Sequence, residues 1–314
     1  MNKPLVILTG PTAVGKTEYS IKLAKKINGE IISADSIQVY KYMDIGSAKV
    51  TKEEMSGVQH YLIDELYPDE DFNIDLFQQK CKQYIEEIYS KGKVPIIAGG
   101  TGFYIQSVLY DIKFEDTQKN QTYRDELEEY VKANGAMSLH DKLRQVDPKA
   151  AEKIHFNNVK RVIRALEYYK ETGNKISEHN EEQRLNESPY NFAYIVLSDD
   201  REKMYERINK RVDIMIEQGL VNEVQTLLNM GYKKDLVSMQ GIGYKEIIQY
   251  IEGDISLDQA IYDIKINTRH FAKRQLTWFR REKNIDMIYY PDFNYDKELI
   301  LDNIIKITKN RTNI

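Results

Sequence analysis

The sequence predicts an α/β protein, in which a parallel sheet with helices on both faces is interrupted by an all-helical insertion. Three observations predict this fold. Short apolar runs alternate with amphipathic helical patterns over roughly the first hundred residues. From about Lys113 to Pro189 the patterns are helical and contain no convincing strand, and a strong strand pattern returns at Phe192. We therefore expect a core of residues 1–112 and 190–314 and a helical domain of residues 113–189.

Composition narrows the class of protein. The chain has 314 residues, enough for roughly two domains. Its 41% hydrophobic and 30% charged residues are typical of a globular protein and exclude collagen-like, disulfide-scaffold and wholly disordered chains. The single cysteine, Cys81, cannot form an internal disulfide, and the five histidines have no zinc-site spacing. No apolar run is long enough for a membrane span, and Leu5–Leu8 is too short for a signal peptide, so we expect a cytoplasmic protein without membrane attachment.

Each core element has its own signal. Short apolar runs predict strands, in chain order, at Leu5–Leu8, Ile31–Ser33, Tyr61–Ile63, Val94–Ala98 and Phe192–Leu197. Apolar stripes at helical spacing predict helices at Thr17–Ile27, Asp75–Tyr89 and Asp200–Gln218, and a shorter helix at Gly102–Leu109. In the second of these, Phe77, Cys81, Ile85 and Ile88 share one face, and Gly92 follows as a stop signal.

The insertion contains three helical patterns, at Thr122–Ala133, Ser138–Gln145 and Val159–Thr172. Ile176–Glu187 is almost wholly polar and reads as an exposed helix end or a loop. The C-terminal stretch Lys306–Ile314 is also polar, and we expect it to fray.

The strongest motif is Gly10-Pro11-Thr12-Ala13-Val14-Gly15-Lys16-Thr17, which fits GxxxxGK[ST]. It lies between a predicted strand and a predicted helix, as a phosphate-binding loop requires, and it indicates a P-loop NTPase-like core. The loop amides and the helix N-terminus would bind an anion, Lys16 would reach the terminal phosphate, and Thr17 would coordinate Mg²⁺. The alternative is a chance match in an ordinary strand-to-helix turn.

The acid that usually helps a P-loop to hold Mg²⁺ is missing from its common place. The strand Val94–Ala98 runs into Gly99-Gly100-Thr101-Gly102 and has no carboxylate after it. Asp35 follows an early strand instead, at the sheet edge where ligands bind. It could bind Mg²⁺ through water or act as a general base, or it could simply cap the next turn. Thr101 could contact a leaving diphosphate or cap the following helix.

Positive charge is concentrated locally. The segment 269–283 carries six Lys or Arg and one acid, against a net charge of −4 for the whole chain. Arg269, Lys273 and Arg280 lie near one helical face, while Phe271, Trp278 and Phe279 are expected to pack inward. Lys160, Arg161 and Arg164 form a second basic group. Such surfaces suit an RNA backbone or a small diphosphate, and charge alone equally fits a solvated face.

These motifs, taken in order, resemble bacterial tRNA dimethylallyltransferases, also called tRNA isopentenyltransferases, over nearly the whole chain. The matching stretches are GPTAVGKT (10–17), ADSIQVYKYMDIGSAK (34–49), QHYLIDEL (59–66), IIAGGTGFYI (96–105), DPKAAEKIH (147–155), KRVIRALE (160–167), MQGIGYKE (239–246) and AKRQLTWFRR (272–281).

The resemblance implies an activity. A dimethylallyl group would pass from dimethylallyl diphosphate to N6 of the adenosine 3′-adjacent to the anticodon, and diphosphate would be released. Residues 10–17 would hold that diphosphate, with Arg211 and Lys273 stabilising its charge and Mg²⁺ bound at Thr17. Asp35 would be the base on N6 and Thr101 a contact of the leaving group.

The resemblance also implies which residues bind the tRNA anticodon stem-loop. We expect the chain to be a monomer. The expected contacts are Asp35, Ser36, Ile37, Gln38, Tyr123, Val159, Lys160, Arg161, Val162 and Ile163, and Arg280 of the basic segment joins them. Tyr40, Phe103 and Tyr104 could stack on the adenine or line the prenyl pocket, or could serve only in packing.

Three alternatives stay open at this stage. An adenylate isopentenyltransferase would prenylate free nucleotides, but it would not need the helical insertion. A P-loop small-molecule kinase would consume ATP. A non-catalytic RNA-binding module would have no need for Lys16 or Asp35.

Overall fold

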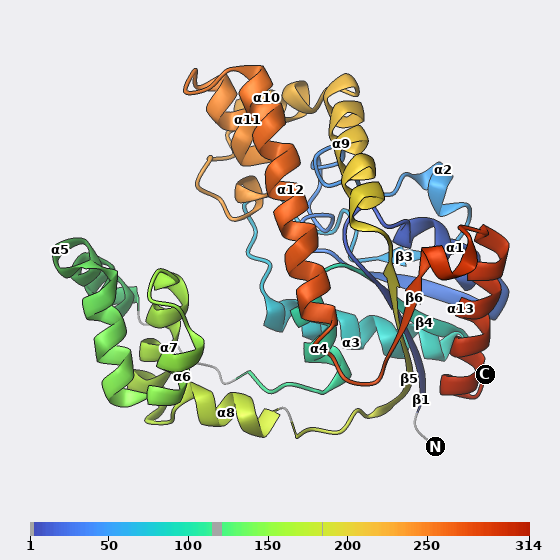
Figure 1. Cartoon of the computed structure of the whole chain (residues 1–314), viewed down its shortest axis with the longest axis horizontal. Helices are drawn as coiled ribbons and strands as arrows, with labels where there is room; N and C mark the ends of the chain where they lie inside the picture. Colours follow the sequence, from blue (N-terminus) through green and yellow to red (C-terminus); the bar gives the residue numbers. More distant parts are fainter. Residues whose placement is uncertain (1–2, 115–120, 184) are drawn as a thin grey trace. The chain divides into compact units, whose positions relative to one another are not determined.

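The computed structural model describes residues 3–114, 121–183 and 185–314 (Figure 1). The chain divides into two compact units, residues 1–109 with 189–314 and residues 110–188. We call them the core unit and the helical unit. The boundaries fall within a few residues of those expected from the sequence.

In the described residues of the core unit, six strands form one parallel sheet in the order β3-β2-β4-β1-β5-β6. The strands are β1 (Lys3–Thr9), β2 (Gly29–Ala34), β3 (His60–Tyr61), β4 (Val94–Gly99), β5 (Tyr190–Ser198) and β6 (Ile285–Tyr289). Four of the five strands expected from apolar runs are confirmed, and the fifth, expected at Tyr61–Ile63, overlaps the two-residue strand β3 only at Tyr61. The sequence analysis missed β6, an edge strand whose pattern Ile285–Tyr289 is mixed and only partly buried.

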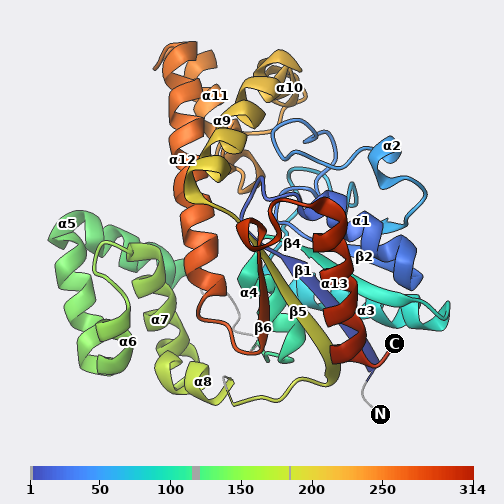
Figure 2. The same cartoon turned by 45° about the vertical axis from the view of Figure 1, so that its right-hand side comes forward.

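Helices cover both faces of the sheet, as predicted (Figures 1 and 2). On one face, α1 (Lys16–Ile27) and α13 (Lys297–Thr312) pack on alternate strand residues such as Val6, Leu8 and Ile195. On the other face, α3 (Ile74–Ser90) packs against β2 and β4 and is joined by α4 (Gly102–Leu109). Burial on both faces explains why the strand sequences are continuous apolar runs rather than alternating ones.

A group of four helices follows the sheet in the core unit. These helices are α9 (Arg201–Glu217), α10 (Leu220–Asn229), α11 (Tyr244–Ile251) and α12 (Leu257–Phe279). Helix α12 packs against α9, α11 and α4, so it runs from this group back to the sheet (Figure 2). The short elements α2 (Lys52–Met55), η1 (Ser238–Gln240) and η2 (Tyr290–Phe293) lie in connections.

The described part of the helical unit contains α5 (Gln121–Val146), α6 (Pro148–Lys153), α7 (Val159–Thr172) and α8 (Ile176–Gln183). Gly135 interrupts α5 with φ 80° and ψ 163°, so α5 is the pair of helices that the sequence predicts. Leu139, Leu143, Val162 and Leu166 are buried in a common core. Asp147 caps α6 through Ala150 N and also accepts hydrogen bonds from the Ser177 amide and hydroxyl, which ties α8 to that core.

The expectation that Lys306–Ile314 frays is wrong. Helix α13 continues to Thr312, and Thr308 and Thr312 are buried with their hydroxyls bonded to Ile304 O and Thr308 O. These threonines read as polar in the sequence, but each satisfies its hydroxyl inside the helix and can therefore face the sheet. Among the described residues, no helix is both long and apolar enough to cross a membrane.

The packing of α13 gives a stability prediction. Ile304 is fully buried between α13 and the sheet, so Ile304→Ala should lower the free energy of unfolding by about 2–5 kcal/mol through lost burial and a residual cavity. Denaturant unfolding followed by circular dichroism measures the change. Lys306→Ala, at an exposed position of the same helix, is the control and should change the stability by no more than about 0.5 kcal/mol. An equal effect of both substitutions would contradict the burial of Ile304.

Candidate active site

The candidate site lies where three adjacent strands end. The phosphate loop follows β1, Asp35 follows β2, and Thr101 follows β4. Because β2, β4 and β1 are neighbours in a parallel sheet, their carboxyl ends meet at one edge. There a cavity of about 1170 Å³ is lined by Lys16, Thr17, Asp35, Thr101 and Arg211, among other residues of the core unit.

The phosphate loop needs its first glycine. Gly10 has φ 148°, and a Cβ there would lie 2.5 Å from Leu197 O, in the strand beside β1. Ala13 and Gly15 also have positive φ, at 62° and 92°. These values give the loop the curved backbone that precedes the N-terminus of α1, where amide groups point toward an anion.

Three side chains outside the motif hold the loop in this shape. Gln275 accepts a hydrogen bond from Thr12 N at 2.9 Å, and Tyr290 donates its hydroxyl to Val14 O at 2.6 Å. Arg207 donates to Ala13 O at 2.9 Å and forms an ion pair with Asp199 at 2.6 Å. Sequence reasoning missed all three, because they come from α12, η2 and α9, far along the chain from the loop.

Lys16 lies at the centre of the charge distribution. Its Nζ donates to Gly10 O at 3.1 Å and to Pro11 O at 2.9 Å. Burial lowers the pKa of Lys16 to about 7, Arg211 lowers it further, and only Asp35 opposes the shift. Burial likewise lowers the pKa of Arg211 from its usual value. Two cationic side chains therefore face a cavity that does not compensate them fully, as expected for the receptor of an anion.

Asp35 is held by its own turn. Its Oδ1 accepts hydrogen bonds from Ile37 N at 2.9 Å and Gln38 N at 3.3 Å. The capping interpretation of Asp35 is therefore correct as far as Oδ1 is concerned. The carboxylate also lines the cavity, and among the described residues none donates to Oδ2. One oxygen orients the group, and the other can serve in chemistry.

The glycines around Thr101 let three elements approach one another closely. A Cβ at Gly99 would lie 2.3 Å from Ala34 O of β2, and one at Gly100 would lie 2.2 Å from Gln275 Nε2. A Cβ at Gly102 would lie 2.3 Å from the Trp278 ring. The stretches GGTG and RQLTW, about 175 residues apart in the sequence, thus pack directly on each other. Thr101 lies at this junction, with its amide donating to Ala34 O and its side chain at the cavity.

The basic segment 269–283 lies mostly in α12, and its residues face the cavity differently from the sequence prediction. Arg274 and Phe271 line the cavity, whereas the predicted diphosphate ligand Lys273 is exposed and is not part of the lining. Phe271 was expected to pack inward but is 36% exposed, while Phe279 is fully buried as expected. Arg269 donates to Asn209 Oδ1, so its charge is directed toward α9. The buried face of α12 contains Ala272, Gln275 and Phe279, and Phe271 lies outside this face.

The aromatic candidates divide into two groups. Tyr40 and Tyr104 are buried and border the cavity, and Tyr104 stacks on Phe77 with ring centroids 4.4 Å apart. Phe103 is 44% exposed and lies against Trp278, at 6.1 Å between ring centroids. Packing is therefore the role that these contacts show for Tyr104.

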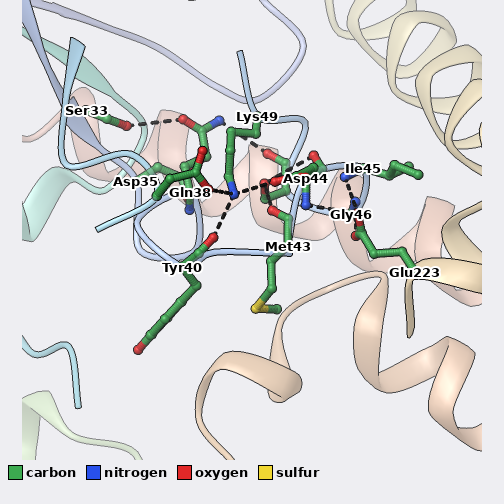
Figure 3. A network of polar contacts seen from close by, with 12 residues as sticks. Ser33, Asp35, Gln38, Tyr40, Met43, Asp44, Ile45, Gly46, Lys49 and Glu223 are labelled. Atoms are coloured by element: carbon green, nitrogen blue, oxygen red, sulfur yellow. Dashed lines mark hydrogen bonds and ion pairs between the residues drawn. The ribbon is translucent and has the colours of Figure 1, made fainter. Parts of the chain in front are cut away.

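The predicted tRNA contacts after β2 lie in one loop, residues 35–49 (Figure 3). Ser36 is exposed and Ile37 is half-buried. Gln38 is occupied within the loop, since it accepts from Ser33 Oγ and donates to the carbonyls of Ser47 and Ala48. The Gln38 side chain thus stabilises the loop, a role that the sequence analysis did not predict.

The remaining predicted tRNA contacts include both exposed and buried residues. Lys160 and Arg161 are exposed on α7, and Arg280 of the core unit is exposed beyond the end of α12. Val162 and Ile163 are 0% and 3% exposed, so their side chains are buried, and their predicted contact with tRNA stays a prediction for the backbone of α7. They fall on the inner stripe of α7, which fills the core of the unit. Val159 and Tyr123 are half-buried against that core.

The donor set fits a magnesium ion that is bound mainly through a substrate. Among residues 3–114, 121–183 and 185–314, no three His, Cys, Asp or Glu side chains are grouped as a metal cage. The cavity wall offers the exposed Thr17 hydroxyl and the Asp35 carboxylate. Mg²⁺ commonly uses one or two protein oxygens together with phosphate oxygens and water, and this set is sufficient for that mode.

Comparisons with known proteins agree on one family. The model of the IPP transferase family matches residues 38–282. The chain is 61% identical to a tRNA dimethylallyltransferase of Lachnoclostridium phytofermentans over 97% of both chains. It is 54% identical to the enzyme of the same name from Acetivibrio thermocellus over 96% of both chains.

Solved structures give the same answer. A tRNA isopentenylpyrophosphate transferase from Bacillus halodurans is 44% identical, with a TM-score of 0.73 over 99% of this chain and 98% of that one. A eukaryotic dimethylallyltransferase acting on tRNA is 30% identical, with a TM-score of 0.81 over 96% of this chain and 78% of that one. The chain therefore belongs to the IPP transferase family, the family of the tRNA dimethylallyltransferases.

Proposed function

We propose that the protein is a tRNA dimethylallyltransferase that transfers the dimethylallyl group of dimethylallyl diphosphate to N6 of the adenosine 3′-adjacent to the anticodon. The observation that carries the proposal is that one cavity joins the phosphate loop with Lys16, the carboxylate of Asp35 and the hydroxyl of Thr101. An anion receptor and a base on the walls of one cavity suit a reaction in which an amine attacks and a diphosphate leaves.

The diphosphate would lie on the phosphate loop. Lys16, Arg211 and the loop amides would stabilise the charge that grows on the leaving oxygens as the allylic C–O bond breaks. Thr101 would donate a hydrogen bond to the same leaving group. Thr17 would hold Mg²⁺, which when bound neutralises part of the diphosphate charge. Because Arg274 lines the cavity and Lys273 does not, Arg274 is the better supported cation of α12 for this role.

The adenine would present its amino group to Asp35. The new C–N bond forms between N6 and the allylic carbon, and the N6 proton passes to the carboxylate, while diphosphate keeps the electron pair of the broken bond. Asp35 Oδ1 is bonded to its own turn, so Oδ2 is the oxygen that can accept the proton. The base must leave its stack to enter the cavity, at a cost of about a few kcal/mol.

The rest of the tRNA would bind positive surface. The exposed Lys160 and Arg161 on α7, and Arg280 after α12, are the cations that support contact with the anticodon stem-loop. The buried thiol of Cys81 and a tRNA substrate suit the cytoplasm.

The proposal is tested by mass spectrometry of nucleosides from unmodified tRNA incubated with the protein, Mg²⁺ and dimethylallyl diphosphate. We expect an adenosine heavier by one C5H8 unit in tRNA that has adenosine 3′ to its anticodon, and none in the same tRNA with guanosine there. Prenylated AMP without tRNA product would make the protein a free-nucleotide transferase, and ATP hydrolysis or phosphoryl transfer alone would make it a kinase.

Asp35→Ala should lower the single-turnover rate by about 10²–10⁴-fold, because the N6 proton loses its acceptor. Thr101→Ala should lower it as well, through the leaving group. Rapid-quench assays with bound tRNA measure both rates, and filter binding should show nearly unchanged tRNA affinity. Asp302→Ala, at an exposed site on α13, is the matched control. Full activity of either site variant would remove the role assigned to that residue.

Binding of diphosphate should be coupled to protonation of Lys16. In the protein without ligand, the pKa of Lys16 is about 7, and a bound anion would raise this pKa. At about pH 8 binding should therefore take up protons on Lys16, whereas at about pH 6 the side chain is already charged and this uptake should vanish. Calorimetry of magnesium diphosphate in buffers of different ionisation enthalpy measures the proton count. Lys16→Arg stays charged throughout and should show only the proton change of the diphosphate itself, without uptake by the side chain. An equal proton count for both proteins at about pH 8 would contradict the low pKa of Lys16.

A further inference from the structure

Glu223 of α10 does not line the cavity, but it accepts hydrogen bonds from Gly46 and Tyr244, which do, and the reaction proposed above does not use it. Its Oε2 accepts hydrogen bonds from Asp44 N at 2.9 Å and Ile45 N at 2.7 Å, and its Oε1 accepts one from Gly46 N at 3.0 Å. The hydroxyl of Tyr244 donates to the same Oε1 at 2.8 Å. Figure 3 shows the side chain reaching from its helix into the turn at residues 44–46.

This contact joins the far end of the 35–49 loop to the helices α10 and α11. Tyr244, the first residue of α11, is fully buried. Burial, followed by the nearby Glu223 charge, raises its pKa well above the usual value, so the hydroxyl stays a donor. Gly46 permits the approach, because a Cβ there would lie 2.6 Å from the Tyr244 ring. The 44–46 turn is therefore fixed on both sides.

Hydrogen bonds within the 35–49 loop connect the 44–46 turn to Asp35. Gln38 bonds the carbonyls of Ser47 and Ala48, which directly follow the turn that Glu223 holds. The amide of the same Gln38, with that of Ile37, bonds Asp35 Oδ1. A second brace is Lys49, whose Nζ donates to Tyr40 O and forms ion pairs with Asp44 and Asp64, each at 2.6 Å. The 44–48 turn and the Asp35 turn thus share one hydrogen-bonded frame (Figure 3).

We propose that Glu223 is a positioning residue for Asp35: it holds the 35–49 loop in the conformation in which the Asp35 carboxylate faces the cavity. The inference rests on the proposed role of Asp35 as the base. In the described part of the chain, Glu223 accepts hydrogen bonds from three backbone amides and one tyrosine hydroxyl, and its side chain does not line the cavity. It acts by pre-ordering the loop before tRNA binds, which spares the reaction the cost of ordering it.

The test combines Glu223→Ala with the milder Tyr244→Phe, which removes only the hydroxyl donor. Glu217→Gln, at an exposed site near the end of α9, is the matched control. Hydrogen exchange in the free protein should be faster for the amides of residues 44–48 in Glu223→Ala and unchanged in Glu217→Gln. This first readout needs no substrate and does not depend on the proposed reaction.

The second readout is the single-turnover rate in two backgrounds. In the wild-type background, Glu223→Ala should lower the rate by about 10–100-fold while the affinity for magnesium diphosphate stays within about twofold, since the phosphate loop is separate from this frame. In an Asp35→Asn background the same substitution should change the residual rate by less than about twofold, because a positioning residue has nothing left to position. Tyr244→Phe should fall between the control and Glu223→Ala.

The outcomes separate the two proposals. An Asp35→Asn variant with the wild-type rate would overturn the base role before any Glu223 variant is measured, and the positioning role with it. If Asp35 proves essential, an equal loss from Glu223→Ala in both backgrounds would mean that Glu223 supports the fold in general. A wild-type rate in Glu223→Ala, with or without faster exchange at residues 44–48, would also overturn the positioning role.

Discussion

The buried amide of Gln275 joins the two loops on which the site depends. Its oxygen accepts from Thr12 N in the phosphate loop, and its nitrogen donates to Gly100 O in the loop after β4. An amide is suited to this position because it offers one acceptor and one donor on the same rigid plane. The contact is possible only because position 100 has no side chain. Helix α12 is thereby bonded to the ends of two neighbouring strands, and Phe271 and Arg274 of the same helix border the cavity.

The electrostatics of the cavity follow from this closure. Residues of α9 and α12 pack against Ala13 of the phosphate loop, and burial lowers the pKa of both Lys16 and Arg211. Charged groups are placed in such surroundings at a cost in stability, and an anionic ligand offsets that cost when it binds. The 35–49 loop also borders the cavity, and the carboxylate of Glu223 anchors it by accepting hydrogen bonds from the amides of residues 44–46. One side of the cavity thus suits a diphosphate, and the other side offers a carboxylate to a neutral amine.

Much of the fold is already visible in local patterns. The strands β1, β2, β4 and β5 are buried on both faces, so each appears as a continuous apolar run that periodicity detects. Hydrophobic periodicity does not predict edge strand β6 or the C-terminal part of α13. Strand β6 is only partly buried, and α13 places threonines against the sheet with their hydroxyls bonded within the helix. In both places tertiary packing decides burial that composition does not predict.

Short stretches of sequence are enough to identify the phosphate loop, to place Asp35 and Thr101 directly after predicted strands, and to supply the motifs of the family resemblance. The folded structure is needed to see which cation of α12 lines the cavity, that Val162 and Ile163 are buried in a core, and that Gln38 and Glu223 hold the Asp35 loop. Elements far away in the sequence set which side of a helix is buried and which partner a buried polar group finds. Glu223 and Gly46 are 177 positions apart, and no local pattern links a glutamate to backbone amides at that distance.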